Sequence, residues 1–404
     1  MNRAQHRTSG ITLEFLGLNP RISQLETDSD ESNQKLAKIS AMKSVPTPAK
    51  RLNQIAQARE QVIEQGAGLE VPLVESWIER SWKRCLAWGH SPSQRVEFDA
   101  VSQAQIQHLQ ASNQPLLLAA KDELDRLSRA ISGTRYFALL TDAKGMVIDT
   151  RGEFDKTDAR ASRIARVGIN LSEQLAGTTA IGAVLAEQQP IWLHRGEHFF
   201  NDNMAYSCAG APLFGPTGEC VGMLDLTGVD VPERPELQHL AALSARSIEN
   251  NWVKQMTPAL LLRFNWAGLS IGSDSDALIG LNADGLVVCA NRAARAITGL
   301  NLQSGEHAGD VFATAWQSLF DLSPQQHLEV PLWTGLQVQI QRDDSKHTSP
   351  ISTRPAPMLK AIETDLIRRA MQQARGNVAE AARRLGISRA TLYRKISPQK
   401  TGDK

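Results

Sequence analysis

The strongest constraint on this chain is a short pattern near its C-terminal end, where residues 377–396 read NVAEAARRLGISRATLYRKI. Its apolar residues recur with the spacing of one helix face: Val378, Ala381, Ala382 and Leu385. Asn377 is suited to cap the start of this helix, and Gly386 tolerates the positive φ that ends one. Ser388 offers a hydroxyl to cap a second helix. The spacing therefore predicts a helix, a tight turn and another helix.

On the second of these helices, Leu392 and Ile396 stand four residues apart and are expected to face the core. The residues left outward, together with the cap, form the predicted DNA-binding set: Ser388, Arg389, Ala390, Thr391, Tyr393, Arg394 and Lys395. Arg389, near the helix start, is placed for a base edge in the major groove. Arg394 and Lys395 are placed for phosphates, which position a protein without reading sequence. We therefore predict double-stranded DNA as a partner.

Charge is distributed in agreement with this prediction. The whole chain carries a net charge of only +1, but residues 360–404 contain 11 Lys or Arg and 4 Asp or Glu. A basic tail thus follows a mildly acidic body. A basic helix alone is as often a solvated face as a DNA-binding one, so the helical spacing, cap and glycine turn carry the prediction.

The tail resembles the Fis-type helix-turn-helix found at the C-terminus of many bacterial enhancer-binding regulators. This resemblance implies a dimer formed through the preceding helix. An apolar stripe suited to both a core and a subunit interface is present there: Ile362, Leu366, Ile367, Ala370 and Met371. We expect a homodimer.

With 404 residues, the chain exceeds what one hydrophobic core usually serves, which predicts several domains. Its four cysteines are scattered, without the pairing of a structural zinc site or a disulfide framework. No apolar run reaches the ~18 to 20 residues needed to span a bilayer, and the N-terminus lacks the apolar stretch of a signal peptide. We therefore expect a cytoplasmic protein that does not act at a membrane.

The hydrophobic period changes along the chain and predicts its elements. Helical spacing is expected around residues 55–82 and 102–131, at Leu175–Ala186, and in a connector at Leu237–Arg263. Strands are expected in hairpins at 136–152 and 208–228, at 190–194, and in pairs at 277–290 and 328–342, with a helix after residue 290.

The predicted fold class is multidomain α+β. The expected domains are a disordered arm at 1–49, a helical region at 50–132, a sensor domain at 133–232, a helical connector at 233–272, a second sensor-like domain at 273–342, a linker at 343–358 and an all-α DNA-binding domain at 359–400.

Residues 168–228, which begin GINLSEQLAGTTAIGAVLAEQQPIWLHRGEHFF, resemble the GAF domain of AcoR-type regulators, among them activators of acetoin and polyol catabolism. The resemblance extends upstream through SWIERSWKRCLAWG. Downstream, Asn291-Arg292-Ala293-Ala294 is similar to the PAS-like region of that family. It implies a small-molecule effector held between a sheet and its covering helices. The candidate ligand-binding residues are Tyr136, Thr178, His198, Asn203, Ser207 and Cys208.

One motif offers an enzyme alternative, because His194-Arg195-Gly196-Glu197-His198 matches the H-x-x-E-H signature of inverted zinc proteases. That signature needs both histidines on one helix face. PIWL before it favours a strand and Gly196 weakens a helix, so we expect no enzyme, metal site or cofactor. A metal or redox sensor that uses His198 or Cys208 stays open as an alternative.

Regulators of this kind normally carry an AAA+ ATPase between sensor and tail, but no G-x-x-x-x-G-K-[ST] occurs in the sequence. We therefore expect a regulator without ATPase activity that acts on RNA polymerase or with a full-length paralogue. An architectural DNA-binding protein, whose GAF-like region serves only for dimerisation, is the second hypothesis. A hydrolase at the H-x-x-E-H site is the third.

Overall fold

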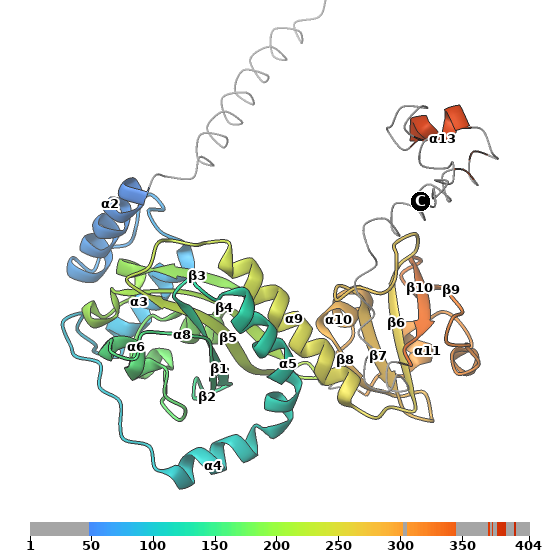
Figure 1. The fold of residues 1–404 in the computed structure, drawn as a ribbon, viewed down its shortest axis with the longest axis horizontal. Helices are drawn as coiled ribbons and strands as arrows, with labels where there is room; N and C mark the ends of the chain where they lie inside the picture. Colours follow the sequence, from blue (N-terminus) through green and yellow to red (C-terminus); the bar gives the residue numbers. More distant parts are fainter. Residues whose placement is uncertain are drawn as a thin grey trace, which may run out of the picture. The chain divides into compact units, whose positions relative to one another are not determined.

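The computed structural model describes residues 48–301, 305–344 and 378–384, together with Met371, Ala374 and Leu392. The chain divides into two compact units, residues 1–321 with 327–340, and residues 322–326 with 341–404. The first unit contains two five-stranded sheets (Figure 1). We call β1–β5 the first sheet and β6–β10 the second sheet. Among the described residues, no helix is both long and apolar enough to cross a membrane.

Helices precede the first sheet in the chain. They are α2 (Pro48–Arg59), which continues as the π-helix η1 (Glu60–Glu64), then α3 (Ser76–Ala87), α4 (Gln103–Ser112) and α5 (Gln114–Ala130). Pro48 begins α2, where its missing N–H costs nothing because the first N–H groups of a helix have no partner within the helix. Helix α2 thus begins two residues before the end of the arm predicted at 1–49, and residues 1–47 lie outside the described residues.

The first sheet has the strand order β2-β1-β5-β4-β3, with antiparallel neighbours throughout. Its strands are β1 (Tyr136–Asp142), β2 (Val147–Arg151), β3 (Ile191–His194), β4 (Tyr206–Phe214) and β5 (Cys220–Val229). The interspersed and following helices are α6 (Ala159–Ile164), α7 (Glu173–Ala176), α8 (Ala180–Glu187) and α9 (Leu237–Gln255), with 3-10 turns η2 (Arg195–Glu197) and η3 (Asn201–Asn203).

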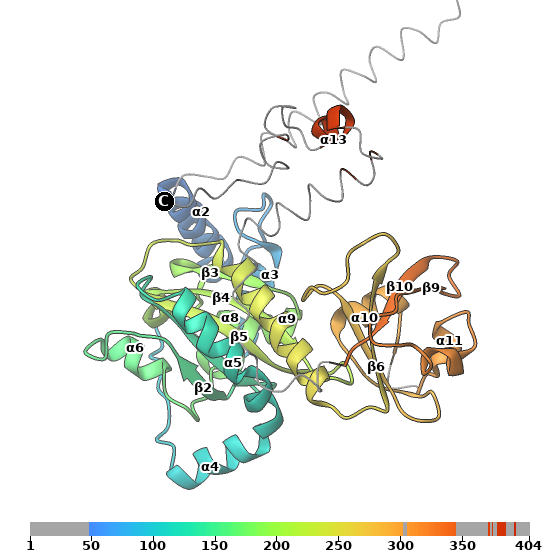
Figure 2. The same ribbon diagram turned by 45° about the vertical axis from the view of Figure 1, so that its right-hand side comes forward.

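Both faces of the first sheet are covered, so β1, β4 and β5 are buried almost throughout. On one face, α5 and α9 pack side by side (Figures 1 and 2) over an apolar cluster that includes Leu140 and Leu226. On the other face, α2, α3 and α8 enclose a second cluster that includes Leu139 and Val184. Because successive side chains of a strand alternate between faces, each strand contributes to both clusters.

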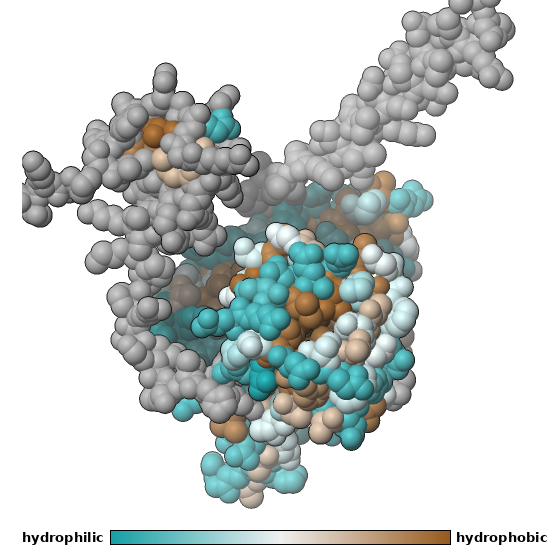
Figure 3. Space-filling model, turned by 90° about the vertical axis from the view of Figure 1, so that its right-hand side faces the viewer, coloured by the Kyte–Doolittle hydropathy of each residue, from teal (hydrophilic) through white to brown (hydrophobic). Residues whose placement is uncertain are grey.

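The second sheet has the order β8-β7-β6-β10-β9. Its elements are β6 (Leu260–Trp266), β7 (Ala277–Leu281), β8 (Val287–Ala290), α10 (Arg292–Thr298), α11 (Ala308–Val311), the 3-10 turn η5 (Trp316–Leu319), β9 (Leu328–Pro331) and β10 (Gln337–Arg342). Figure 3 shows apolar side chains among hydrophilic ones on this side of the molecule. The part of the chain that forms the second sheet, residues 260–342, exposes several large apolar side chains: Trp266, Leu269, Leu286, Val288, Trp333 and Leu336.

The predicted hairpins form, and two of them share one turn chemistry. Asp142 Oδ1 accepts from the N–H groups of Lys144 and Met146 in the β1–β2 turn. Asn282 Oδ1 accepts in the same way in the β7–β8 turn. Side chains of this length stabilise a turn by accepting from the backbone two residues on.

Four predicted helical stretches differ in the structure. The run expected around 55–82 is interrupted between Glu64, where η1 ends, and Ser76, where α3 begins. The helix expected at Leu175–Ala186 is two helices, because Gly177 between them has φ +66 and ψ −159, which only glycine adopts readily. The run at 102–131 divides into α4 and α5 at Asn113. The connector expected to reach Arg263 ends at Gln255, and β6 follows, so the second sheet begins at Leu260.

Candidate ligand cavity and DNA-binding segment

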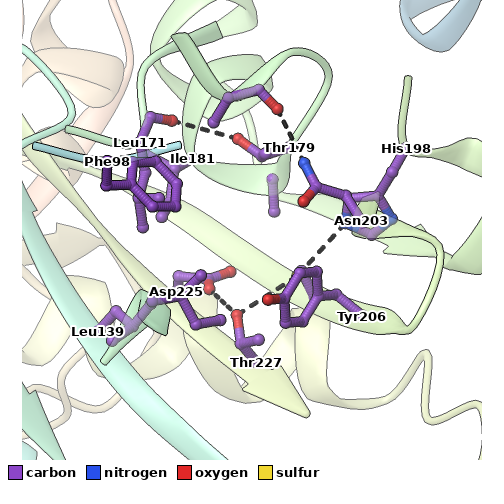
Figure 4. A pocket seen from close by; sticks show the side chains of 14 residues that line it. Phe98, Leu139, Leu171, Thr179, Ile181, His198, Asn203, Tyr206, Asp225 and Thr227 are labelled. Carbon is purple, nitrogen blue, oxygen red and sulfur yellow. Dashed lines mark hydrogen bonds between the residues drawn. The ribbon is translucent and has the colours of Figure 1, made fainter. Parts of the chain in front are cut away.

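A cavity lies on the α8 side of the first sheet (Figure 4). Its volume is about 30 Å³. Its walls come from β1, β4 and β5, from the loops around η3, from α8, and from the segment before α4. The lining residues are Phe98, Leu139, Ile164, Leu171, Ala176, Thr179, Ala180, Ile181, His198, Asn203, Tyr206, Cys208, Asp225 and Thr227. Most of these are apolar, with a few convergent polar groups, which is the usual composition of a small-molecule site.

Three of the six predicted ligand-binding residues line this cavity: His198, Asn203 and Cys208. The other three do not. Tyr136 on β1 and Ser207 on β4 each lie one residue before a position on the cavity side of the sheet. Because side chains alternate along a strand, these two face the other side of the sheet, and Tyr136 belongs to the cluster under α5 and α9. Thr178 packs against α3, where its hydroxyl is 2.7 Å from Ser81 Oγ.

Asp225 and Thr227 stand two apart on β5 and therefore share the cavity face. Thr227 Oγ1 donates to Asp225 Oδ2, whereas Asp225 Oδ1 is buried without a hydrogen-bond partner. Burial raises the pKa of Asp225 to about 7, because desolvation disfavours the charged form. The sequence reasoning missed both residues. Their signal was the polar alternation of LDLTG in an otherwise apolar strand.

His198 and Cys208 lie next to each other in the cavity wall. His198 Nδ1 is 2.8 Å from the carbonyl oxygen of Arg195, which can only accept, so this nitrogen carries the proton. Burial lowers the pKa of His198 to about 4, so the ring is neutral and its Nε2 is an acceptor, 3.7 Å from Cys208 Sγ. Burial also raises the pKa of the Cys208 thiol well above its ordinary value. A neutral, buried thiol is the opposite of a reactive one, which argues against a redox centre.

The loop that carries His198 and Asn203 is held by Arg59 from α2. Its guanidinium donates to the carbonyl oxygens of Gly196, His198 and Phe199, and to Asn201 Oδ1 at 3.0 Å. Desolvation lowers the pKa of this buried guanidinium to about 10. Its fixed fork of donors suits several acceptors at once. Arg59 therefore sets the position of this wall of the cavity.

Helix α3 contacts the residues around the cavity through charged and polar side chains. Arg84 forms two hydrogen bonds with the Glu173 carboxylate, at 2.6 and 2.8 Å. Trp82 Nε1 donates to the carbonyl oxygen of Glu197 at 2.8 Å. The SWIERSWKRCLAWG segment therefore belongs structurally to the cavity domain.

The H-x-x-E-H motif does not form the helical arrangement that a zinc protease requires. His194 ends β3 and its Nδ1 is 2.7 Å from Ser207 Oγ, while Gly196 lies in a 3-10 turn. The Glu197 carboxylate accepts from Arg51 and from the N–H of His194. Across the described ranges, no group of three or more His, Cys, Asp or Glu side chains is placed to hold a metal ion.

In the C-terminal unit, α13 (Val378–Arg384) matches the first helix of the predicted helix-turn-helix. Ala381 and Ala382 are buried with Leu392 and Ala374, and Met371 and Val378 pack against this cluster. Leu392 thus faces the core, as its spacing predicted. Leu385 and Ile396, and the predicted DNA-binding residues Ser388 to Thr391 and Tyr393 to Lys395, lie outside the described residues.

Comparison with known families assigns both regions. Residues 47–250 match the family model for the MimR N-terminal domain, which is half of the chain. The chain belongs to this MimR-type family. Residues 358–397 of the MimR-type chain match the model of bacterial regulatory proteins of the Fis family. The helix-turn-helix predicted from spacing is therefore confirmed as a Fis-type DNA-binding segment.

Curated relatives of this MimR-type chain are regulators of transcription. The acetoin catabolism regulatory protein of Cupriavidus necator is 29% identical over 250 residues, which cover 60% of this chain and 37% of the relative. The propane 2-monooxygenase operon transcriptional activator MimR of Mycolicibacterium smegmatis is 31% identical over 211 residues, 51% and 33% of the two chains. The match therefore spans about a third of the length of these relatives.

Among solved structures, the E. coli DhaR(N)–DhaL complex aligns with 66% of this chain and 98% of that one. The sequence identity is 13% and the TM-score is 0.41, which is too distant for any inference about function.

Proposed function

We propose that this protein is a DNA-binding regulator of transcription that senses a small molecule in the first-sheet cavity. One observation carries the proposal: a Fis-type DNA-binding segment and a MimR-type domain with a small, mostly apolar cavity occur in one chain. In this reading the first sheet is a GAF-like sensor, the second a PAS-like domain, and the protein is not an enzyme. It works in the cytoplasm, as its transcription-regulating relatives suggest.

The mechanism we propose is a shift between two dimer geometries. The effector stabilises the geometry that binds it better, and this changes the spacing of the two recognition helices on DNA. Arg389 reads a base edge, whereas Arg394 and Lys395 contact phosphates. Without an ATPase domain of its own in this sequence, the regulator acts by recruiting or blocking polymerase, or through a full-length paralogue.

Fluorescence anisotropy tests the DNA-binding part. The full chain is titrated onto DNA from upstream of its gene and onto a scrambled duplex, at two salt concentrations. We expect at least ~100-fold preference for the native DNA, and we expect Arg389→Ala to remove that preference at a cost of about 1 to 3 kcal/mol. Equal affinity for both duplexes at both salt concentrations contradicts sequence-specific regulation.

The small volume of the cavity favours a second candidate, an architectural DNA-binding protein whose first sheet serves only to dimerise. About 30 Å³ holds roughly one or two water molecules. Ligand-induced stabilisation separates the candidates, because a molecule that binds only the folded state raises the unfolding temperature with its concentration. A sensor shows such a rise for some small molecule, and a purely architectural protein shows none.

A further inference from the structure

The free oxygen of Asp225 is the most informative polar atom in the first-sheet cavity. The side chain is 1% exposed, and its Oδ1 has no hydrogen-bond partner among the described residues, whereas Oδ2 accepts from Thr227. A buried acceptor without a partner costs free energy that water or a ligand recovers. Figure 4 shows Asp225 on the cavity floor beside Thr227.

Several other polar groups that line the cavity donate to backbone carbonyl groups of the protein. Asn203 Nδ2 donates to the carbonyl oxygen of Ala176, and Tyr206 Oη to that of Arg160. The hydroxyl of Thr179 donates to the carbonyl oxygen of Leu171. The neutral His198 ring presents an acceptor nitrogen on this side. Asp225 Oδ1 and His198 Nε2 are thus acceptors that face the cavity, whereas the donors of Thr179, Tyr206 and Thr227 are used within the protein.

The charges around the cavity restrict the class of ligand further. The fourteen side chains that line the cavity include no lysine or arginine. An anionic ligand would lie beside the Asp225 carboxyl without a compensating cation, which is costly in a desolvated site. The apolar wall, in which Leu139, Ile164 and Ile181 take part, suits a hydrocarbon body.

We propose that the cavity binds a small, non-anionic organic molecule whose hydroxyl or amine group donates a hydrogen bond to Asp225 Oδ1. This inference rests on the proposed sensing function and specifies its ligand class. An alcohol and an amine satisfy the same acceptor. Asp225 is then the residue that selects the ligand, and Thr227 positions its carboxylate.

Phe98 is the lining side chain that we expect to move when a ligand binds. Its ring belongs to the segment between α3 and α4 and lies against the cavity while remaining half-buried. The volume of about 30 Å³ is less than a ligand of several heavy atoms needs, so part of the lining has to move when such a ligand binds.

The test is calorimetric titration of the full chain at pH 8 with four sets of two- to four-carbon compounds: alcohols and diols, amines, ketones and carboxylates. We expect alcohols or amines to bind at least about 10-fold more tightly than ketones of the same skeleton, as for a hydrogen bond to a charged group. Carboxylates should bind most weakly. Whichever of the first two sets binds more tightly identifies the donor.

The decisive variant is Asp225→Asn, which keeps the shape but replaces the free acceptor. The Thr227 hydroxyl still donates to the remaining carbonyl oxygen, so the amide NH₂ faces the cavity. We expect donor ligands to lose about 10-fold or more in affinity and ketones to gain. Asp284→Asn, in the exposed β7–β8 turn, removes the same formal charge and should change neither affinity.

Three results overturn the proposal: equal affinity of donor ligands for Asp225→Asn and wild type, carboxylates as the tightest set, or no binding by any set, which leaves water as the only occupant. DNA anisotropy on the same samples keeps the two proposals apart. Loss of DNA preference with intact ligand selectivity refutes the regulator and leaves the ligand assignment standing. Loss of ligand selectivity with intact DNA preference refutes only the ligand assignment.

Discussion

Replacement of Asp225 by Asn should make the protein more stable at high pH and leave it no more stable at low pH. The folded-state pKa of Asp225 is about 7, against an ordinary value of 3.8. At 1.36 kcal/mol per pH unit, this difference corresponds to about 4 kcal/mol of destabilisation above pH 7. The side chain is fully buried, so solvent screening reduces this figure little.

The sign follows from proton binding. Between pH 4 and pH 7 the folded state holds a proton on Asp225 that the unfolded chain has lost, so wild-type stability falls as pH rises through this window. The amide of the variant does not titrate. Its unsatisfied NH₂ costs about 1 to 3 kcal/mol at every pH. From pH 5 to pH 8, the difference in unfolding free energy should therefore shift by about 2.5 kcal/mol in favour of the variant.

Urea unfolding at pH 5, 6, 7 and 8, followed by tryptophan fluorescence, measures this difference. Glu197, whose pKa burial raises to about 7, and His194 and His198, whose pKa values burial lowers to about 4, titrate in both proteins and cancel. Asp284→Asn serves as the charge-matched control. A stability gap that does not change with pH, or that moves in favour of wild type as pH rises, would refute the assignment of Asp225 as a desolvated, unpaired acid.

Four further predictions follow from the same contacts. Arg59→Met should lower the unfolding free energy by about 2 to 4 kcal/mol by leaving buried carbonyl groups unpaired, measured by urea unfolding; Arg129→Met, at an exposed position of α5, is the comparison, and equal losses would contradict the special role of Arg59. Phe98→Ala should admit longer alcohols or amines, seen as unfolding-temperature shifts absent in wild type, and an unchanged size limit would count against gating by this ring. Affinity for donor ligands should fall and that for ketones should rise as pH drops below 7, because the proton added to Asp225 Oδ1 converts an acceptor into a donor; parallel titrations at pH 6 and pH 8 that agree would contradict this. Arg389→Ala should abolish sequence preference with little change in affinity for scrambled DNA, checked by anisotropy, and a uniform loss on both duplexes would instead indicate a phosphate contact.

The hairpins were predictable because their determinants are local. Asp142 and Asn282 carry the turn chemistry within four residues, and the flanking alternation supplies the strands. The connector helix was predicted too long for a local reason as well. Pro258 disfavours helical geometry at the residue before it, and α9 ends at Gln255, but the predicted helix included residues 260–263, the start of the apolar run LLLRFNW.

The cavity was only partly predictable, because sequence does not state which face of a buried strand meets which helix. Cys208 and Ser207 are neighbours in β4, yet only Cys208 lines the cavity. In a sheet covered on both sides, both positions are buried and equally plausible. Asp225 was missed since its significance depends on having no partner, which only the packed structure reveals.

The hydrogen bonds from Arg59 to the loop that carries His198 have a practical consequence for work on the isolated sensor. The apolar core of the sensor contains Ile55 and Trp82 together with Leu139 and Val184. Ile55 and Trp82 belong to α2 and α3, which precede the first sheet by at least 48 residues. A fragment cut at the start of β1 would keep every strand and lose one wall of its core. Expression of a shortened sensor should therefore begin before Pro48, where the first of these helices starts.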